Sequence, residues 1–130
     1  MITLLQTEMY HHDTDVDETL KMNTIKLVNW IDHLKYIKKE LNNLISIYRE
    51  DLSYKLYDEN VLQKLQKKEI ENNNLLNALR KYMSLREVIA ECEDIQCDMI
   101  FIKEQEIYRR CYLYHLDKYR RLKVNFLNKV

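Results

Sequence analysis

Residues 27–48 read LVNWIDHLKYIKKELNNLISIY, and this stretch decides the fold because its apolar residues recur every three or four positions. That spacing places them along one side of an α-helix. A second apolar lane, seven residues apart, runs beside the first through Trp30, Ile37 and Leu44. Two neighbouring lanes make a face wider than the seam of a two-stranded coiled coil, as a bundle core requires. We therefore predict one helix over residues 16–56.

The chain of 130 residues contains no glycine and no proline. These two residue types normally supply sharp turns and helix ends, so their absence predicts a few long elements. Their absence also excludes Gly-rich phosphate loops, dinucleotide-binding fingerprints and nucleophile elbows. The sequence thus predicts the all-α class and says little about chemistry.

Two further helices are expected after residue 60. The run Asp58-Glu59-Asn60 is the best turn in the chain, and a second turn lies either at Ser84 or at residues 92–96. Ser84 begins a Ser-x-x-Glu capping box, whereas the later turn gives three helices of similar length and is favoured for that reason. The predicted fold is an antiparallel three-helix bundle of long helices with coiled-coil-like packing, or four helices if both breaks are real.

The start of the chain differs from the rest. Residues 1–12 show no clear period and are expected to form a flexible arm. Residues 13–18 (DTDVDE) combine capping types with acidic residues that suit the positive end of a helix dipole. We therefore expect an arm over 1–12 and a single bundle domain over 13–130.

The charge balance bears on partners. The 21 basic and 21 acidic residues give zero net charge, so no long-range attraction to nucleic acid or anionic membrane is expected. Little self-repulsion remains, which favours a protein partner or a homodimer. Residues 1–24 and 84–100 are acidic and residues 103–130 are basic, and we expect these segments to pair inside one bundle.

The sequence also leads to expectations about the cellular compartment and about cofactors. No apolar run approaches the length of a membrane span, and no signal peptide is evident. The cysteines are Cys92, Cys97 and Cys111, an odd number that argues against a disulfide framework. We expect small buried thiols, a reducing cytoplasm and no cofactor.

The pair Arg110 and His115 is the sharpest catalytic candidate. Its R-x4-H spacing resembles that of HEPN-family ribonucleases, which are small helical domains. The resemblance implies that Arg110 stabilises a phosphorane and that His115 moves protons at a cleft between two subunits. The alternative is structural, because His115 lies in one helical lane with Tyr112 and Tyr119 and so suits a core imidazole bonded to a hydroxyl.

Binding residues are expected on the last helix. The exposed positions that we single out are Tyr114, Lys118, Arg120 and Arg121. Aromatic and cationic side chains together favour protein interfaces, and a basic run with an aromatic residue also fits phosphate contacts with nucleic acid. Since acidic segments elsewhere balance the cations, we favour a protein partner over nucleic acid.

Metal-ligand residue types cluster at His11-His12-Asp13, followed by Asp15 and Asp17. The run fails as an EF-hand loop, because Glu18 stands where glycine is needed. Glu8-x-x-His11 has the spacing of half a di-iron site, but no second Glu-x-x-His follows. We therefore expect no metal site.

Two motifs carry a family resemblance. They are Trp30-x-x-x-Leu34-x-x-Ile37-x-x-Glu40-x-x-x-Leu44 and Tyr119-Arg120-Arg121-Leu122-Lys123 with Phe126-Leu127. The motifs resemble small, uncharacterised all-helical proteins of Bacteroidetes bacteria. The resemblance implies a helical bundle and a bacterial cytoplasm, and it brings no functional residues. The leading hypothesis is a non-enzymatic interaction or assembly module, with the ribonuclease as the alternative.

Overall fold

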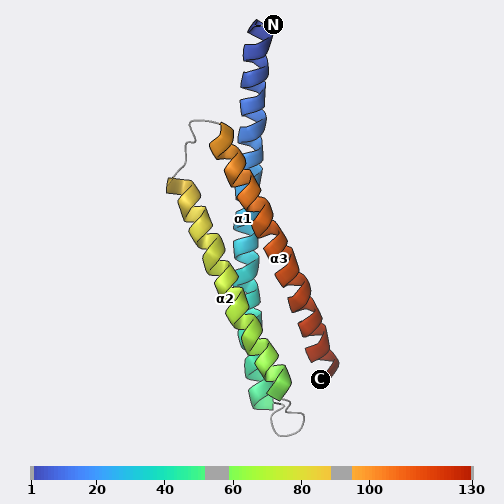
Figure 1. Cartoon of the computed structure of the whole chain (residues 1–130). Helices are drawn as coiled ribbons and strands as arrows, with labels where there is room; N and C mark the ends of the chain where they lie inside the picture. Colours follow the sequence, from blue (N-terminus) through green and yellow to red (C-terminus); the bar gives the residue numbers. More distant parts are fainter. Residues whose placement is uncertain (1, 52–58, 89–94, 130) are drawn as a thin grey trace.

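The computed structural model describes the backbone of residues 2–51, 59–88 and 95–129 and the side chains of 18–50, 60–87 and 97–128. It contains helix α1 (Ile2–Asp51), helix α2 (Glu59–Val88) and helix α3 (Ile95–Lys129), and these three ranges hold no strand. The helices pack along one another as a three-helix bundle (Figure 1). The predicted fold class is confirmed.

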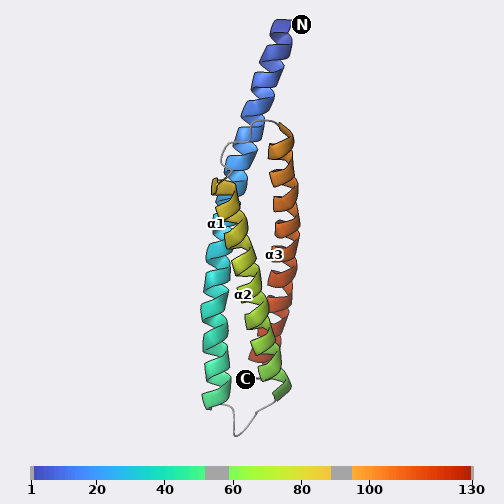
Figure 2. The ribbon, with the colours of Figure 1, turned by 60° about the vertical axis from the view of Figure 1, so that its left-hand side comes forward.

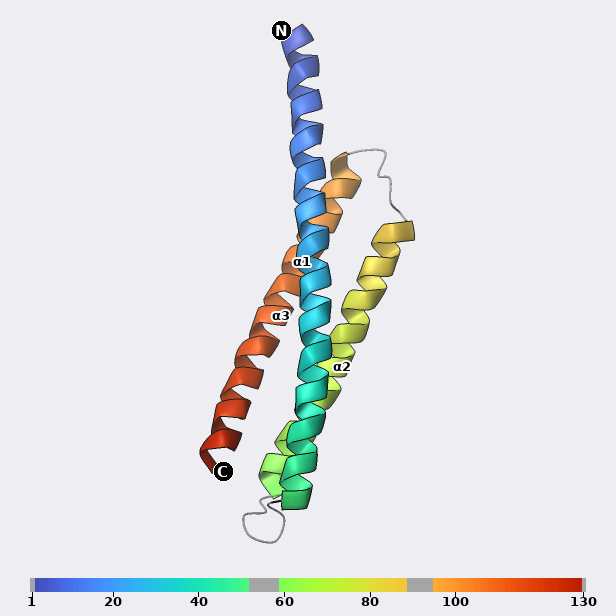
Figure 3. The ribbon, with the colours of Figure 1, turned by 180° about the vertical axis from the view of Figure 1, so that it is seen from behind.

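Successive helices run in opposite directions along the bundle. The Asn72 side chain bonds to the Leu34 backbone and the Arg86 side chain to the Leu20 backbone, so α1 and α2 are antiparallel. Helix α3 runs in the same direction as α1. At 1.5 Å per residue, α1 is about 75 Å long, and its first turns extend beyond both other helices (Figures 2 and 3).

The core lies on the faces that the periodicity predicted. Leu27, Leu34 and Leu41 of α1 are fully buried, as are Leu65 and Leu79 of α2. Each such leucine contributes about 2 kcal/mol through removal of its side chain from water. Aromatic rings dominate the apolar contribution of α3, where Phe101, Tyr112, Tyr119 and Phe126 are buried together with Leu116.

The second turn falls where helix length favoured it. Helix α2 continues through Ser84 to Val88, and α3 begins at Ile95. The break at Ser84, and with it the four-helix alternative, is wrong. A capping box contributes only about 1 kcal/mol, and each residue that continues the helix adds a backbone hydrogen bond instead.

Helix α1 begins at Ile2, ahead of the start predicted at residues 13–18. Asp and Thr are common at helix starts, but without glycine or proline nothing in the preceding residues stops the helix. The assignment of residues 1–12 as an arm outside the bundle domain stays a prediction. The predicted end at residue 56 lies outside the described residues.

The cysteines depart from expectation. Cys97 takes part in a disulfide, and Cys111 is a free, exposed thiol. An odd number of cysteines prevents complete pairing but permits one bond, so the expectation of three thiols is wrong for Cys97. The expectation of burial is wrong for Cys111, which lies on the outer side of α3.

Candidate functional site

His115 is a buried structural residue. Its side chain is 6% exposed, and Nε2 lies 2.8 Å from Oδ1 of Asn72. The Asn72 amide nitrogen donates in turn to the Leu34 carbonyl at 2.9 Å, which ties all three helices together. Burial, aided by the positive charge of Lys68, lowers the pKa of His115 to about 4. The imidazole is therefore neutral and donates its Nε2 proton to Asn72.

Arg110 lies apart from this buried group. Its side chain is 76% exposed and pairs with Glu106 at 3.4 Å, beside a closer pair between Arg109 and Glu106 at 2.8 Å. Hydrogen bonds from Arg109 and Arg110 lower the pKa of Glu106 to about 2. A ribonuclease site requires Arg110 and His115 in one solvent-reachable cleft, and the structure does not bring them together.

A second imidazole is also committed to packing. His33 of α1 hydrogen-bonds through Nδ1 to the Tyr112 hydroxyl of α3, and Trp30 stacks on the same tyrosine with ring centroids 5.4 Å apart. Burial lowers the pKa of His33 and raises that of Tyr112. The hydrogen bond and the stacked rings fix α3 against α1.

Glu40 forms the third contact between α1 and α3. It accepts hydrogen bonds from Tyr119 and Tyr36 and pairs with Lys123 at 2.9 Å. Burial opposes its ionisation, but these bonds outweigh burial and lower its pKa. The pKa of Tyr119 is raised by burial and by the adjacent carboxylate. These contacts use the carboxylate to link α3 to α1.

The four predicted binding residues do reach solvent. Tyr114 is 67% exposed, and Lys118, Arg120 and Arg121 are exposed as well. The Lys118 ammonium lies 5.3 Å from the centre of the Tyr114 ring, a cation–π contact. Arg121 pairs with Asp117 at 3.2 Å. These residues form an exposed aromatic and cationic surface on α3.

Sequence reasoning missed the apolar part of this surface. Ile100 and Ile107 are 56% and 60% exposed, and they precede Tyr114 at intervals of seven residues. A heptad spacing keeps side chains on nearly one side of a helix. The seven-residue spacing is visible in the sequence. The neighbouring lane through Tyr112 and Tyr119 has the stronger helical period, because it forms the core side of α3.

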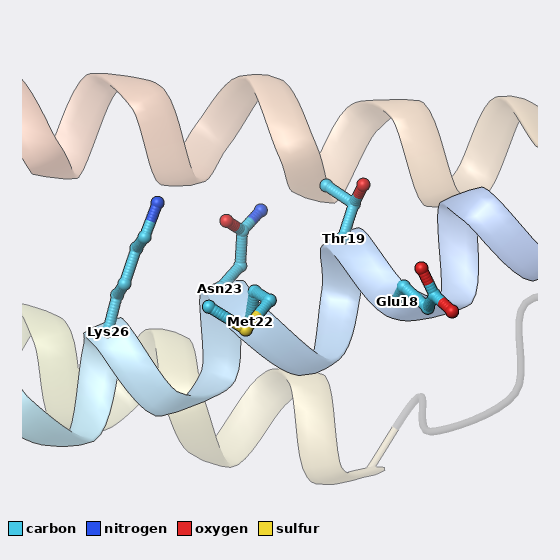
Figure 4. Close-up of a pocket in the computed structure, with 5 residues that line it drawn as sticks. All are labelled: Glu18, Thr19, Met22, Asn23 and Lys26. Carbon is cyan, nitrogen blue, oxygen red and sulfur yellow. The ribbon is translucent and has the colours of Figure 1, made fainter.

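The surface hollows offer no catalytic set. Figure 4 shows one of them, a shallow depression along α1 lined by Glu18, Thr19, Met22, Asn23 and Lys26. No imidazole or thiol lines it, and its residues all come from one helix. Among the described side chains, no three His, Cys, Asp or Glu residues gather as metal ligands. The run from His11 to Asp17 lies outside those side chains.

No family model, curated protein or solved structure matches the chain. Across the described helices, no segment has the length and hydropathy of a membrane crossing. The exposed surface of α3 is therefore the feature that bears on function, since both described histidines serve packing.

Proposed function

We propose that this protein is a non-enzymatic helical interaction or assembly module that works through the exposed side of α3. The observation that carries the proposal is the heptad series Ile100, Ile107 and Tyr114, all more than half exposed on a helix whose opposite side is core. Large apolar side chains that recur along one side of a helix are characteristic of protein contacts. The cations Lys118 and Arg121 continue the same side.

The ribonuclease alternative receives no support from the geometry. It needs a titrating imidazole, whereas His115 is buried, neutral and bonded to Asn72. Its arginine partner faces water on another side of α3 and pairs with Glu106. We therefore do not propose it.

Site-specific photo-cross-linking in cells tests the proposed function. A benzophenone amino acid at Tyr114 should give a protein adduct, because this side chain lies at the centre of the proposed surface. The matched control is the same amino acid at Asn77, which is exposed on α2. Absence of any protein adduct at Tyr114, or adducts to nucleic acid alone, would contradict the proposal.

A further inference from the structure

The outer lane of α3 is defined here by five exposed residues: Ile100, Ile107, Tyr114, Lys118 and Arg121. They recur at intervals of seven, seven, four and three residues, which keeps them along one side of the helix. The first three are apolar or aromatic and the last two are cationic. The lane therefore changes along its length from a hydrophobic stripe to a basic one.

The two ends of the three-helix bundle carry opposite charge. Residues 2–20 of α1 hold five acidic residues and no lysine or arginine. Gln105 bonds to the Asn23 backbone and Phe126 packs on Tyr48, so α3 runs beside the later part of α1. The basic half of α3 is thus far from the acidic start of α1 (Figures 1, 2 and 3). The expected pairing of acidic and basic segments inside one bundle stays a prediction, and the basic half of α3 does not lie beside residues 2–20.

From this arrangement, and building on the proposed function, we infer that the occupant of the outer lane is a second copy of the chain lying antiparallel. A twofold axis near Ile107 brings the apolar halves of the two lanes together. Tyr114 then meets the partner's Ile100, and Lys118 and Arg121 extend toward the acidic start of the partner's α1. A closed twofold contact of this kind is the commonest form of homo-oligomer.

The register of the bundle makes the contacts consistent. Since Gln105 lies beside Asn23 and both helices rise equally, the first turn of α3 lies at the height of residues 13–17 of α1. With Ile107 at the axis, Lys118 falls opposite the partner's first turn of α3, and Arg121 falls at a height just beyond the start of that helix. The cations of each copy therefore lie at the height of the partner's acidic stretch, which spans residues 8–18 of α1.

The charge distribution favours an antiparallel second copy over a parallel copy and over nucleic acid. A parallel pair would place acidic beside acidic and basic beside basic, and like charges across an interface oppose association. Nucleic acid would gain only the few cations at one end and would meet repulsion at the other. An antiparallel copy satisfies both ends at once and covers the exposed isoleucines.

Sedimentation of the intact chain tests the association. We expect a species of twice 16.0 kDa at tens of micromolar, with dissociation at high salt. Ile107→Lys should raise the dimer dissociation constant more than about tenfold, because it places two ammonium groups together at the axis. Ile70→Lys is the matched control, since Ile70 is 59% exposed on α2. A monomer at every concentration, or equal effects of both variants, overturns the inference.

Disulfide trapping tests the orientation in a Cys111→Ser background. Ile107→Cys should cross-link two copies, and Arg121→Cys should not, because only positions near an antiparallel axis meet themselves. Cross-linking of both variants would indicate a parallel pair, and cross-linking of neither would remove the axis; either result overturns the inference. A monomer that still cross-links to a different protein through Tyr114 would leave the proposed function standing.

Discussion

Asn72 illustrates how one polar residue organises an apolar core. It is fully buried in the run Asn72-Asn73-Asn74, yet α2 continues through it without a break. Its side chain uses both ends, accepting from His115 of α3 and donating to the Leu34 carbonyl of α1. Tertiary contacts thus explain why a polar residue occupies the buried position 72.

Replacing Asn72 should destabilise the fold. Asn72→Ala leaves the His115 N–H and part of a carbonyl unpaired in the core, and we expect a loss of about 2–3 kcal/mol in the free energy of unfolding. Urea denaturation measures this change. Asn74→Ala, on the exposed side of the same turn, should cost less than about 0.5 kcal/mol. Equal losses for the two variants would contradict the assigned role.

Acid should destabilise the protein through His115. Its pKa is about 4 in the fold and about 6.5 in an unfolded chain, so below pH 6.5 the unfolded state binds more protons. Stability should fall by about 3 kcal/mol between pH 6.5 and pH 4, with His33 adding in the same direction. Urea midpoints across this range should decline less steeply in His115→Gln. An unchanged slope would be evidence against burial of a neutral imidazole.

At the scale of the element, a junction near the start of α3 joins the three helices. Arg86 of α2 donates to the Gln105 side chain at 3.1 Å and to the Leu20 carbonyl at 3.2 Å, and Gln105 donates to the Asn23 carbonyl. Gln105 is only 3% exposed. These polar groups link α1, α2 and α3 at one height, beside the buried rings of Tyr82 and Phe101.

Gln105→Ala should loosen that end selectively. Without the amide, Arg86 loses one acceptor and α1 loses a bond to α3, so the helices separate more often at this height. Hydrogen exchange should become several-fold faster at residues 19–26 and stay unchanged around Glu40. Gln63→Ala, an exposed position on α2, serves as the control and should change neither region.

The sequence predicted those features of the helices that depend on neighbouring residues, and it did not predict those that depend on contacts between helices. The lane through Leu27, Leu34 and Leu41 predicted the buried side of α1, because periodicity is a local property. Capping types misplaced the start of α1 and suggested a break at Ser84 that does not occur, since their preference is smaller than the cooperativity of a continuing helix. The bond between Asn72 and His115 was out of reach, because periodicity does not determine how helices align in height.

For the candidate site too, local features were predictable from the sequence and three-dimensional arrangement was not. Tyr114, Lys118, Arg120 and Arg121 were predicted as exposed, and they are. Arg110 and His115 are five residues apart in sequence, but the structure separates them because residues at this spacing point about 140° away from one another on a helix. A spacing alone therefore does not make a shared cleft.

At the scale of the whole molecule, the thiol of Cys111 reports on association. It is exposed between Ile107 and Tyr114, next to the outer lane of α3. Dimer formation through that lane should shield it, so maleimide labelling should slow several-fold as protein concentration rises from the micromolar range to a hundred times that value. The same rate at both concentrations would argue against the antiparallel pair. Ile107→Lys should label quickly throughout.

The buried link from Leu34 through Asn72 to His115 also has a mechanical consequence. Leucines repeating every three or four residues present a similar profile after a slide of two turns, so an apolar seam alone resists shear weakly. The link acts as a pin halfway along the bundle and fixes the helices in register. Sliding one helix along another would leave an amide, an imidazole and a carbonyl buried without hydrogen-bond partners. Stretched along its axis, the rod should resist until this pin fails and then yield abruptly.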